Sequence, residues 1–259
     1  MEALLVEIGA PRLRRLGITV SDVPSAEHRL YELLARTDPD SAHGRYNALL
    51  RRLTSFVRAM ECGCLTDLQL LEAFMRRLGE LSAAGRVYFT GGATALLFGW
   101  RATTLDVDLM LEGEIERLLQ EFPRLKEELR MCVELASPAE FIPELPGWRH
   151  RSVFIARHGQ IDFYHYDPYA QALAKLERGH AMDLADVREM ISRGLVERRE
   201  ALRLFGEIEP VLYRYPAIDP GSFRRRVEEL LAEDSTESGE GTRPDLPRVA
   251  QLADASSSS

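Results

Sequence analysis

The chain has 259 residues, a hydrophobic fraction of 45% and a formal net charge of −8 at pH 7. This length allows one large domain or two small ones, and the apolar content is ordinary for a protein with a sizeable core. The negative charge excludes a global positive field, so we expect no DNA partner. No apolar run approaches the ~20 residues of a membrane-spanning helix, and acidic Glu2 and Glu7 replace the basic start of a signal peptide. We therefore expect a cytoplasmic protein without a membrane partner.

Three cysteines are too few for a disulfide framework, which agrees with a reducing compartment. Cys62 and Cys64 lie close together, but no second Cys or His pair lies at zinc-ligand spacing. We interpret them as small residues near a helix boundary, and we expect Cys132 to be buried.

Residues from about 25 to 84 are predicted to be helical. Apolar residues recur there at three- and four-residue spacing, which is typical of amphipathic helices. A further helix is predicted from Asp67, with Thr66 as its N-cap. Four arginines lie before this helix: Arg45, Arg51, Arg52 and Arg58. They could contact a phosphate backbone, but nearby acidic residues balance their charge, so we interpret them as a solvated helix face. We assign residues 1–65 to an N-terminal helical extension, and one hypothesis makes it an oligomerisation or partner-docking unit.

The central part of the chain alternates strands and helices. Residues 86–90 predict a strand, Gly91-Gly92 a sharp turn, and residues 93–98 a short helix closed by Gly99. A second strand is predicted over residues 104–111 and a helix over 114–129. Residues 152–157 and 160–164 then predict a hairpin around His158-Gly159.

The C-terminal third is predicted to be helical. Asp167 is the expected cap of a helix that ends at Gly179, and Asp183 of the next helix, which Gly194 ends. A last helix runs from Asp219-Pro220 to about Ala232. Residues 233–259 are polar and low in complexity, and we expect them to form a disordered acidic and serine-rich tail. The element order predicts an α+β fold with a small mixed sheet over residues 66–232.

Two acidic residues stand together in the second predicted strand. Because residues two apart on a strand share one face, Val107 enters the core while Asp106 and Asp108 lie side by side. Such a pair repels itself, and a fold tolerates it best when a cation neutralises it. Oxygen-only ligands on a strand suit Mg²⁺, with Mn²⁺ as an alternative.

Two further features fit the same chemistry. If the strand carrying Asp162 lies beside the first pair, Asp162 becomes a third carboxylate facing the same metal, and all three acids become catalytic candidates. Gly91 and Gly92 let the backbone between a strand and a helix approach a phosphate. We assign no role to the scattered histidines.

Gly91-Gly92, a thirteen-residue spacer and Asp106-Val-Asp108-Leu resemble the signature of the polymerase-β-like nucleotidyltransferase superfamily. Arg101 and Thr104 before the acidic pair resemble its minimal bacterial branch. So does the segment Asp167–Arg178 followed by Asp183-Leu-Ala-Asp186. That branch includes AbiEii/MenT-like toxins of toxin–antitoxin systems and an uncharacterised bacterial family, to which this chain looks closest. The resemblance covers roughly residues 66–232.

The resemblance implies roles for named residues. Asp106 and Asp108 would hold Mg²⁺, and Lys175 with Asp183 would contact the nucleotide. Arg178 shares a helix face with Lys175, and Arg101 precedes the acidic strand, so both join the nucleotide-binding candidates with Gly91, Gly92 and Thr104. The chain has Gly-Gly-Ala where many members have Gly-Ser, which removes a hydroxyl that could hold a phosphate.

These features predict a Mg²⁺-dependent enzyme that transfers a nucleoside monophosphate from an NTP to a hydroxyl. By resemblance, the acceptor is a tRNA 3′ end or a partner protein, and the chain is a toxin–antitoxin component with a cognate toxin or antitoxin. The alternative is a catalytically inactive nucleotide-binding or sensing module of such a pair. The Gly-Gly-Ala departure favours it, as does the acidic tail, which could occupy a basic cleft.

Overall fold

The computed structural model describes residues 2–15, 17–21, 24–39, 42–62, 65–81 and 83–232. A five-stranded mixed sheet has the strand order β3-β2-β1-β5-β4. Its strands are β1 (Gly85–Phe89), β2 (Val107–Gly113), β3 (Val133–Leu135), β4 (Val153–His158) and β5 (Ile161–His165). β1 is antiparallel to β2 and parallel to β5, while β3 is parallel to β2 and β4 is antiparallel to β5. The predicted α+β fold with a small mixed sheet is confirmed.

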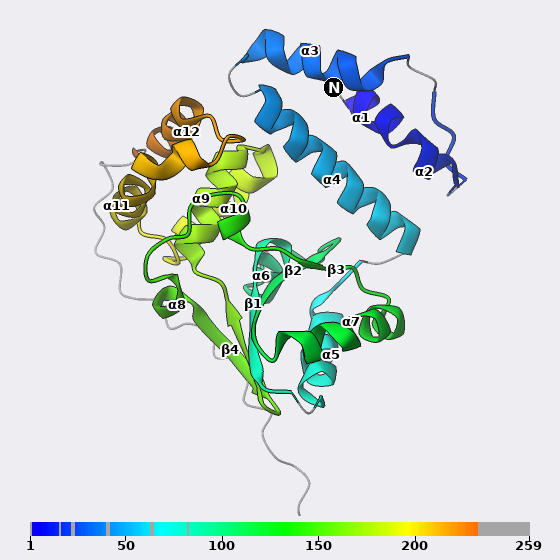
Figure 1. Ribbon diagram of the computed structural model, residues 1–259, viewed down its shortest axis with the longest axis vertical. Coiled ribbons are helices and arrows are strands. Elements are labelled where there is room, and N and C mark those ends of the chain that lie inside the picture. The colour runs from blue at the N-terminus through cyan, green and yellow to red at the C-terminus, as the bar shows by residue number, and fades with distance from the viewer. Residues whose placement is uncertain are drawn as a thin grey trace, which may run out of the picture.

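Helices cover both faces of the sheet (Figure 1). One side carries α5 (Leu68–Gly79) and α7 (Ile115–Leu129), and the short α6 (Gly91–Leu97) connects β1 to β2. The other side carries α8 (Trp148–Arg151), α9 (Pro168–Arg178), α10 (Ala181–Ser192), α11 (Arg198–Ile208) and α12 (Pro220–Ala232). Two 3₁₀ turns, at Pro138–Glu140 and Glu209–Arg214, complete the core. Among the described residues, no helix is both long and apolar enough to cross a membrane.

The first hydrophobic core lies between the sheet and the helices α5 and α7. Alternate residues of three neighbouring strands point into it, as the two-residue period of a strand requires. They are Val87 and Phe89 of β1, Leu109 of β2, and Ile161 and Phe163 of β5, all fully buried. This packing fixes which residues face the opposite side of β2, where Asp108 lies.

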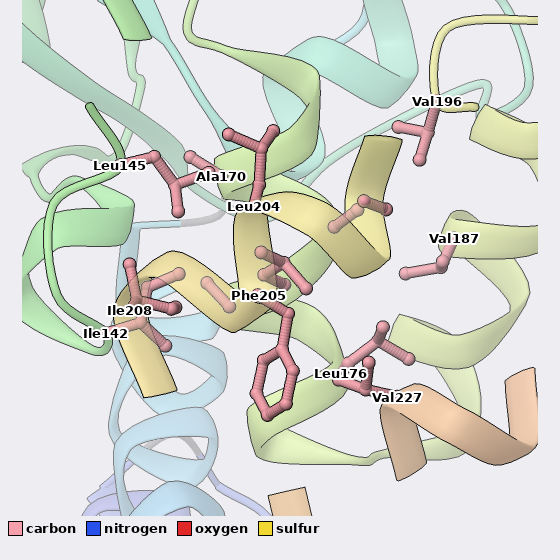
Figure 2. Packing of buried hydrophobic residues seen from close by; sticks show 14 of the residues in the cluster. Ile142, Leu145, Ala170, Leu176, Val187, Val196, Leu204, Phe205, Ile208 and Val227 are labelled. Carbon is pink, nitrogen blue, oxygen red and sulfur yellow. The ribbon is translucent and has the colours of Figure 1, made fainter. Parts of the chain in front are cut away.

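The second core lies on the opposite face, among helices α9 to α12 (Figure 2). Helix α9 runs through it and is buried over most of its length, because α10, α11 and α12 all pack against it. Trp148 and Tyr166 stack with ring centroids 4.3 Å apart beside it. A helix enclosed in this way holds its polar residues in fixed positions, and Gln171 and Lys175 are both buried.

The N-terminal helices are α1 (Glu2–Ile8), α2 (Ala10–Arg15), α3 (Ala26–Thr37) and α4 (Ala42–Cys62). They form a small cluster of their own around Leu30 and Leu34. The cluster meets the rest of the chain where α4 contacts α9, and where Asp38 accepts a hydrogen bond of 3.3 Å from the Ser222 hydroxyl of α12. The division of the chain into a helical extension and an α+β core stays a prediction.

Several local predictions need correction. Asp67, not Thr66, caps α5, because its carboxylate accepts the Leu70 N–H at 2.8 Å. Helix α10 begins one turn earlier than expected, with His180 as N-cap, so Asp183 lies within its first turn. β2 begins at Val107, which leaves Asp106 just before the strand.

Other local predictions are confirmed, and some concern side chains or segments outside the described residues. Asp167 caps α9 through the Tyr169 N–H, α12 starts at Pro220, and Cys132 is buried. The Cys62 and Cys64 side chains lie outside the described residues, as do the predicted tail over 233–259 and the side chains of Arg51, Arg52 and Arg58.

Candidate active site

The site is built where the chain turns from β1 into α6. Helix α6 begins at Gly91, not at Ala93 as predicted, so the two glycines are its first residues. Gly91 has a φ of +60°, and a Cβ added there would lie 2.9 Å from an Asp108 carboxylate oxygen. A Cβ on Gly92 would lie 2.0 Å from the Thr104 hydroxyl. Only glycine fits both the backbone conformation at Gly91 and the two close approaches. The glycine pair therefore brings the β1–α6 turn directly against the acidic strand.

Three carboxylates meet beside this turn. Asp106 precedes β2, Asp108 lies within β2, and Glu134 of β3 is the register partner of Asp108. One oxygen from each of the three lies within 4.8 Å of the others. The Asp106 backbone is held by the Thr104 hydroxyl, which donates to the Asp106 carbonyl at 2.9 Å. Such an oxygen-only group has the chemistry and the spacing to hold a divalent cation.

The electrostatics of Asp108 support this assignment. Burial, followed by the charges of Asp106 and Glu134, raises the pKa of the Asp108 carboxyl to about 7. The positive charges of Arg178 and Lys175 act in the opposite direction but do not offset these effects. The protein thus keeps a carboxylate where its negative charge is costly, and a bound cation would relieve that cost.

Asp162 does not join the other acids, which corrects the prediction that it faces the same metal. It is the register partner of Arg86, and Arg86 is the partner of Glu112 on β2. Asp162 is therefore level with Glu112, four residues beyond Asp108 and about 13 Å further along the sheet. Its carboxylate forms an ion pair with Arg157, which lowers its pKa.

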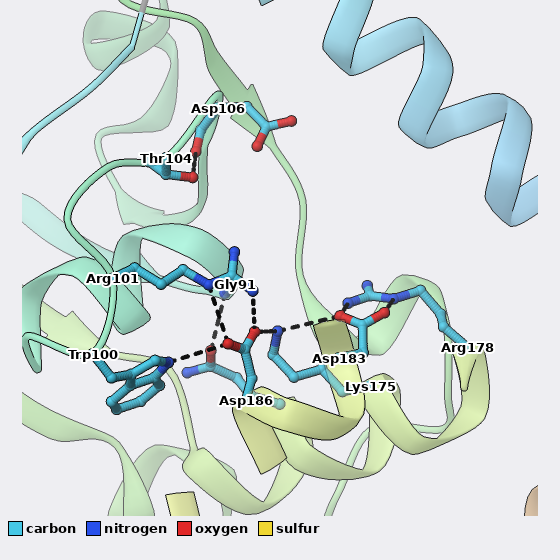
Figure 3. A network of polar contacts seen from close by, with 10 residues as sticks. Gly91, Trp100, Arg101, Thr104, Asp106, Lys175, Arg178, Asp183 and Asp186 are labelled. Carbon is cyan, nitrogen blue, oxygen red and sulfur yellow. Dashed lines mark hydrogen bonds and ion pairs between the residues drawn. The ribbon is translucent and has the colours of Figure 1, made fainter. Parts of the chain in front are cut away.

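A network of buried and half-buried charges lies beside the acidic cluster (Figure 3). The Lys175 ammonium of α9 donates to Asp186 at 2.6 Å and to Asp183 at 3.4 Å. Arg178 donates to both carboxylate oxygens of Asp183, at 3.1 and 2.9 Å. Burial alone would raise the pKa of Asp183, but the charge and hydrogen bonds of Arg178 lower it to about 2. This carboxylate is therefore ionised at neutral pH.

Asp186 extends the network to the segment after α6. Arg101 donates to its two oxygens at 3.1 and 2.6 Å, and the Trp100 indole N–H donates to it at 3.1 Å. Gln171 forms a second link, because its side-chain oxygen accepts the Gly91 N–H at 3.0 Å. The Gly91 N–H is thus already engaged within the protein. Helices α9 and α10 are thereby tied to the β1–α6 turn and to the loop before β2.

The structure brings most of the predicted site residues together. Gly91, Gly92 and Thr104 surround the acidic cluster, while the side chains of the other nucleotide-binding candidates form the charged network: Arg101, Lys175, Arg178 and Asp183. Three cations and the two carboxylates of Asp183 and Asp186 leave this network with one net positive charge. Its basic side chains lie near enough to Asp108 for Lys175 and Arg178 to lower its pKa.

Sequence reasoning missed Glu134 and underrated Asp186. β3 has three residues, too few for a period-two pattern to stand out, although Val133 and Glu134 do face opposite sides. Asp186 lies three residues after Asp183 in a helix start, a position where acids are common for local reasons. Its burial to 3% exposure and its three donor residues, Trp100, Arg101 and Lys175, are visible only in the fold.

Comparison with known proteins agrees with this geometry. No curated protein and no solved structure matches the chain. The model of one family, described as "Nucleotidyltransferase of unknown function (DUF6036)", matches residues 67–203. The match covers more than half of the sequence and contains the glycine turn, the three acids and the charged network. The chain belongs to this nucleotidyltransferase family.

Proposed function

We propose that the protein transfers a nucleoside monophosphate from an NTP to a hydroxyl of an RNA, such as a tRNA 3′ end, or of a protein. The single observation that carries this proposal is the cluster of Asp106, Asp108 and Glu134 against the glycine turn. In such a transfer, the acceptor oxygen bonds to the α-phosphorus, the bond to the β-phosphate breaks, the hydroxyl proton is lost and pyrophosphate leaves. The family match supports the general activity, and the acceptor is part of the proposal.

The three carboxylates would hold Mg²⁺. Their oxygen-only donor set and the raised pKa of Asp108 both fit a hard divalent cation. Bound there, the ion would neutralise the acids and polarise the phosphate oxygens of the NTP. Thr104 and Gly91 hold the carboxylates in place through the Asp106 backbone and the close approach to Asp108.

The charged network is suited to the triphosphate. Lys175 and Arg178 project from one face of α9, and Arg101 approaches from the loop before β2 (Figure 3). Asp183 and Asp186 fix these cations before the substrate arrives, so little side-chain entropy remains to be lost on binding. Pre-positioned positive charge of this kind stabilises the negative charge that develops on a transferring phosphoryl group.

The test is incubation of the protein with each α-³²P-labelled NTP, Mg²⁺, total tRNA and cell lysate. The Asp106→Ala/Asp108→Ala variant is the control, and a Glu134→Gln variant tests the third acid. We expect label in RNA or protein with the parent and a loss of at least a hundredfold in both variants. Equal labelling by parent and double variant would overturn the proposal.

The alternative function is a nucleotide-sensing module of a toxin–antitoxin pair without catalysis. The observation that favours it is Ala93, which follows the glycine pair and offers no hydroxyl to a phosphate. Tight Mg²⁺-dependent NTP binding without label transfer to any acceptor would select this alternative. An increase in transfer on removal of residues 233–259 would instead identify the acidic tail as autoinhibitory.

A further inference from the structure

A second group of arginines lies near the C-terminal end of α9, where Arg178 is found. A small hollow, open to solvent, lies where α4, α9 and α12 meet. Its charged lining consists of Arg45, Arg178 and Arg226 with Glu177 and Asp219, and Gly44 and Ala217 complete the wall. Gly44 approaches the chain before α12 so closely that a Cβ there would lie 2.8 Å from the Ala217 carbonyl oxygen. The N-terminal extension and the α+β core therefore pack closely at this wall of the hollow.

Two of its arginines form no ion pair with any carboxylate of the described residues. The guanidinium of Arg226 donates to the backbone carbonyls of Leu176 and Glu177 at the end of α9, which are neutral acceptors. Arg45 is half-buried on α4 and has no hydrogen bond or ion pair with any described residue. Burial lowers the pKa of Arg226, and the like charges of Arg225 and Arg45 act in the same direction, while Glu177 and Asp219 act against them. An anion would relieve this crowding of positive charge.

The two acids on the lining form no ion pair with Arg45 or Arg226 among the described residues. Asp219 is committed to the start of α12, where its oxygens accept the N–H groups of Gly221 and Ser222 at 3.1 and 3.2 Å. Arg178 is already paired with Asp183, so Arg45 and Arg226 against Asp219 and Glu177 leave no net charge in the hollow. What the hollow offers to an anion is therefore two guanidinium groups without a carboxylate partner among the described residues. A guanidinium pair with free donors is the arrangement that binds phosphate oxygens.

Arg178 connects the hollow to the proposed catalytic centre. It lines the hollow, and its charge also acts on Asp108. An anion held between Arg45 and Arg226 would thus lie beside Arg178, which belongs to the charged network of the catalytic centre. A polymer with a phosphate in the hollow could continue past Arg178 toward the carboxylates.

We propose that the hollow between α4, α9 and α12 binds a backbone phosphate of the acceptor strand, and that the acceptor is therefore an RNA. This inference rests on the proposed nucleotidyl transfer and names the class of its acceptor. A protein acceptor would have no need of a phosphate site beside the triphosphate network. The N-terminal extension then contributes to acceptor binding through Arg45.

The test compares Arg45→Ala with Arg29→Ala, which removes the same charge from an exposed position on α3 outside the hollow. The probe is a short single-stranded RNA with a 5′ fluorophore and a free 3′ hydroxyl, followed by fluorescence anisotropy over a range of salt concentrations. For Arg45→Ala we expect about a three- to tenfold loss of affinity and a salt slope lower by about 0.7. Arg45→Lys should restore most of the affinity, and Arg29→Ala should bind as the parent does.

Each other outcome overturns the inference. Equal RNA affinity of Arg45→Ala and Arg29→Ala would show that the hollow does not bind the acceptor RNA. Binding of inorganic phosphate that depends on Arg45, without binding of RNA, would reduce it to a small-anion site. A parallel loss of Mg²⁺-NTP affinity in Arg45→Ala, measured by calorimetry, would make the hollow part of the NTP site. RNA binding needs no turnover, so an Asp106→Ala background separates this result from failure of the proposed transfer.

Discussion

At the scale of single residues, the site depends on how closely the glycine turn approaches the acids. Gly91 combines a left-handed backbone with a carboxylate oxygen close to where its Cβ would be. Gly99 provides a natural comparison, because it has a φ of +82° and a Cβ added to it would meet no atom within 4 Å. A comparison of the two glycines therefore separates the effect of a positive φ from the effect of a side chain placed against Asp108.

We predict that Gly91→Ala and Gly99→Ala both lose about 1–2 kcal/mol of unfolding free energy, because each forces alanine into the left-handed region. Only Gly91→Ala should also displace Asp108 and weaken Mg²⁺ binding, on the order of tenfold. Chemical unfolding and calorimetric titration with Mg²⁺ measure the two effects. Unchanged Mg²⁺ affinity in Gly91→Ala would show that Asp108 does not depend on this contact.

The raised pKa of Asp108 predicts a pH dependence of stability in the metal-free protein. The folded state keeps the Asp108 proton up to about pH 7, whereas the unfolded chain releases it near pH 4. Between these values the folded state binds more protons, so this group lowers the unfolding free energy as pH rises, by at most about 4 kcal/mol.

Urea unfolding of the parent and Asp108→Asn at about pH 5 and about pH 8 checks this prediction. The variant should gain stability relative to the parent as pH rises, and Mg²⁺ should reduce the difference. A constant difference between the two proteins would mean that the Asp108 carboxyl titrates normally.

At the scale of elements, the contact of α9 and α10 with the β1–α6 segment depends on one buried carboxylate. Asp186 accepts hydrogen bonds from Lys175, Arg101 and Trp100. Removing it leaves a buried ammonium, a guanidinium and an indole N–H short of an acceptor. We therefore predict that Asp186→Ala loses about 3–5 kcal/mol of unfolding free energy.

Glu200→Ala is the matched control for this prediction, because it breaks the exposed ion pair of Glu200 with Arg203 within α11. Its effect should stay within about 1 kcal/mol. Chemical denaturation measures the unfolding free energy of both variants and of the parent. Similar losses in the two proteins would show that the network around Asp186 contributes no more than a surface pair.

At the scale of the whole molecule, the boundary between extension and core can be tested. Both large hydrophobic cores consist of residues between Leu70 and Leu231, while the N-terminal helices pack around Leu30 and Leu34. We predict that a fragment of residues 66–232 folds cooperatively and retains Mg²⁺-NTP binding, because it keeps both cores, the acids and the charged network. Thermal unfolding by circular dichroism and calorimetric NTP titration check this. A fragment without a cooperative transition would make residues 1–65 part of the core.

The same fragment lacks Gly44 and Arg45, which line the hollow proposed for RNA. It should therefore bind the RNA probe at least as weakly as Arg45→Ala does. Parental RNA affinity in a folded fragment would contradict a role for the extension in acceptor binding.

The sequence by itself determined the features that depend on local pattern. Period-two alternation places Val107 in the core and Asp108 on the other face, and the glycine spacing predicts a turn beside the acids. The Asp167 cap of α9 and the start of α12 at Pro220 were predictable because both depend on neighbours in the chain. The α+β class follows from the order of these elements.

Only the tertiary structure decided which distant residues meet. Strand order and register place Glu134 beside Asp108, and they place Asp162 about 13 Å from the level of Asp108 along the sheet. The spacing of these residues along the chain predicts neither position. The burial of Lys175 was also not predictable from the sequence. Its face of an amphipathic helix would be solvated if α9 stood alone, but α10, α11 and α12 pack around α9 and bury the Lys175 side chain. Periodicity reports what one element can present, while packing against other elements selects what it contacts.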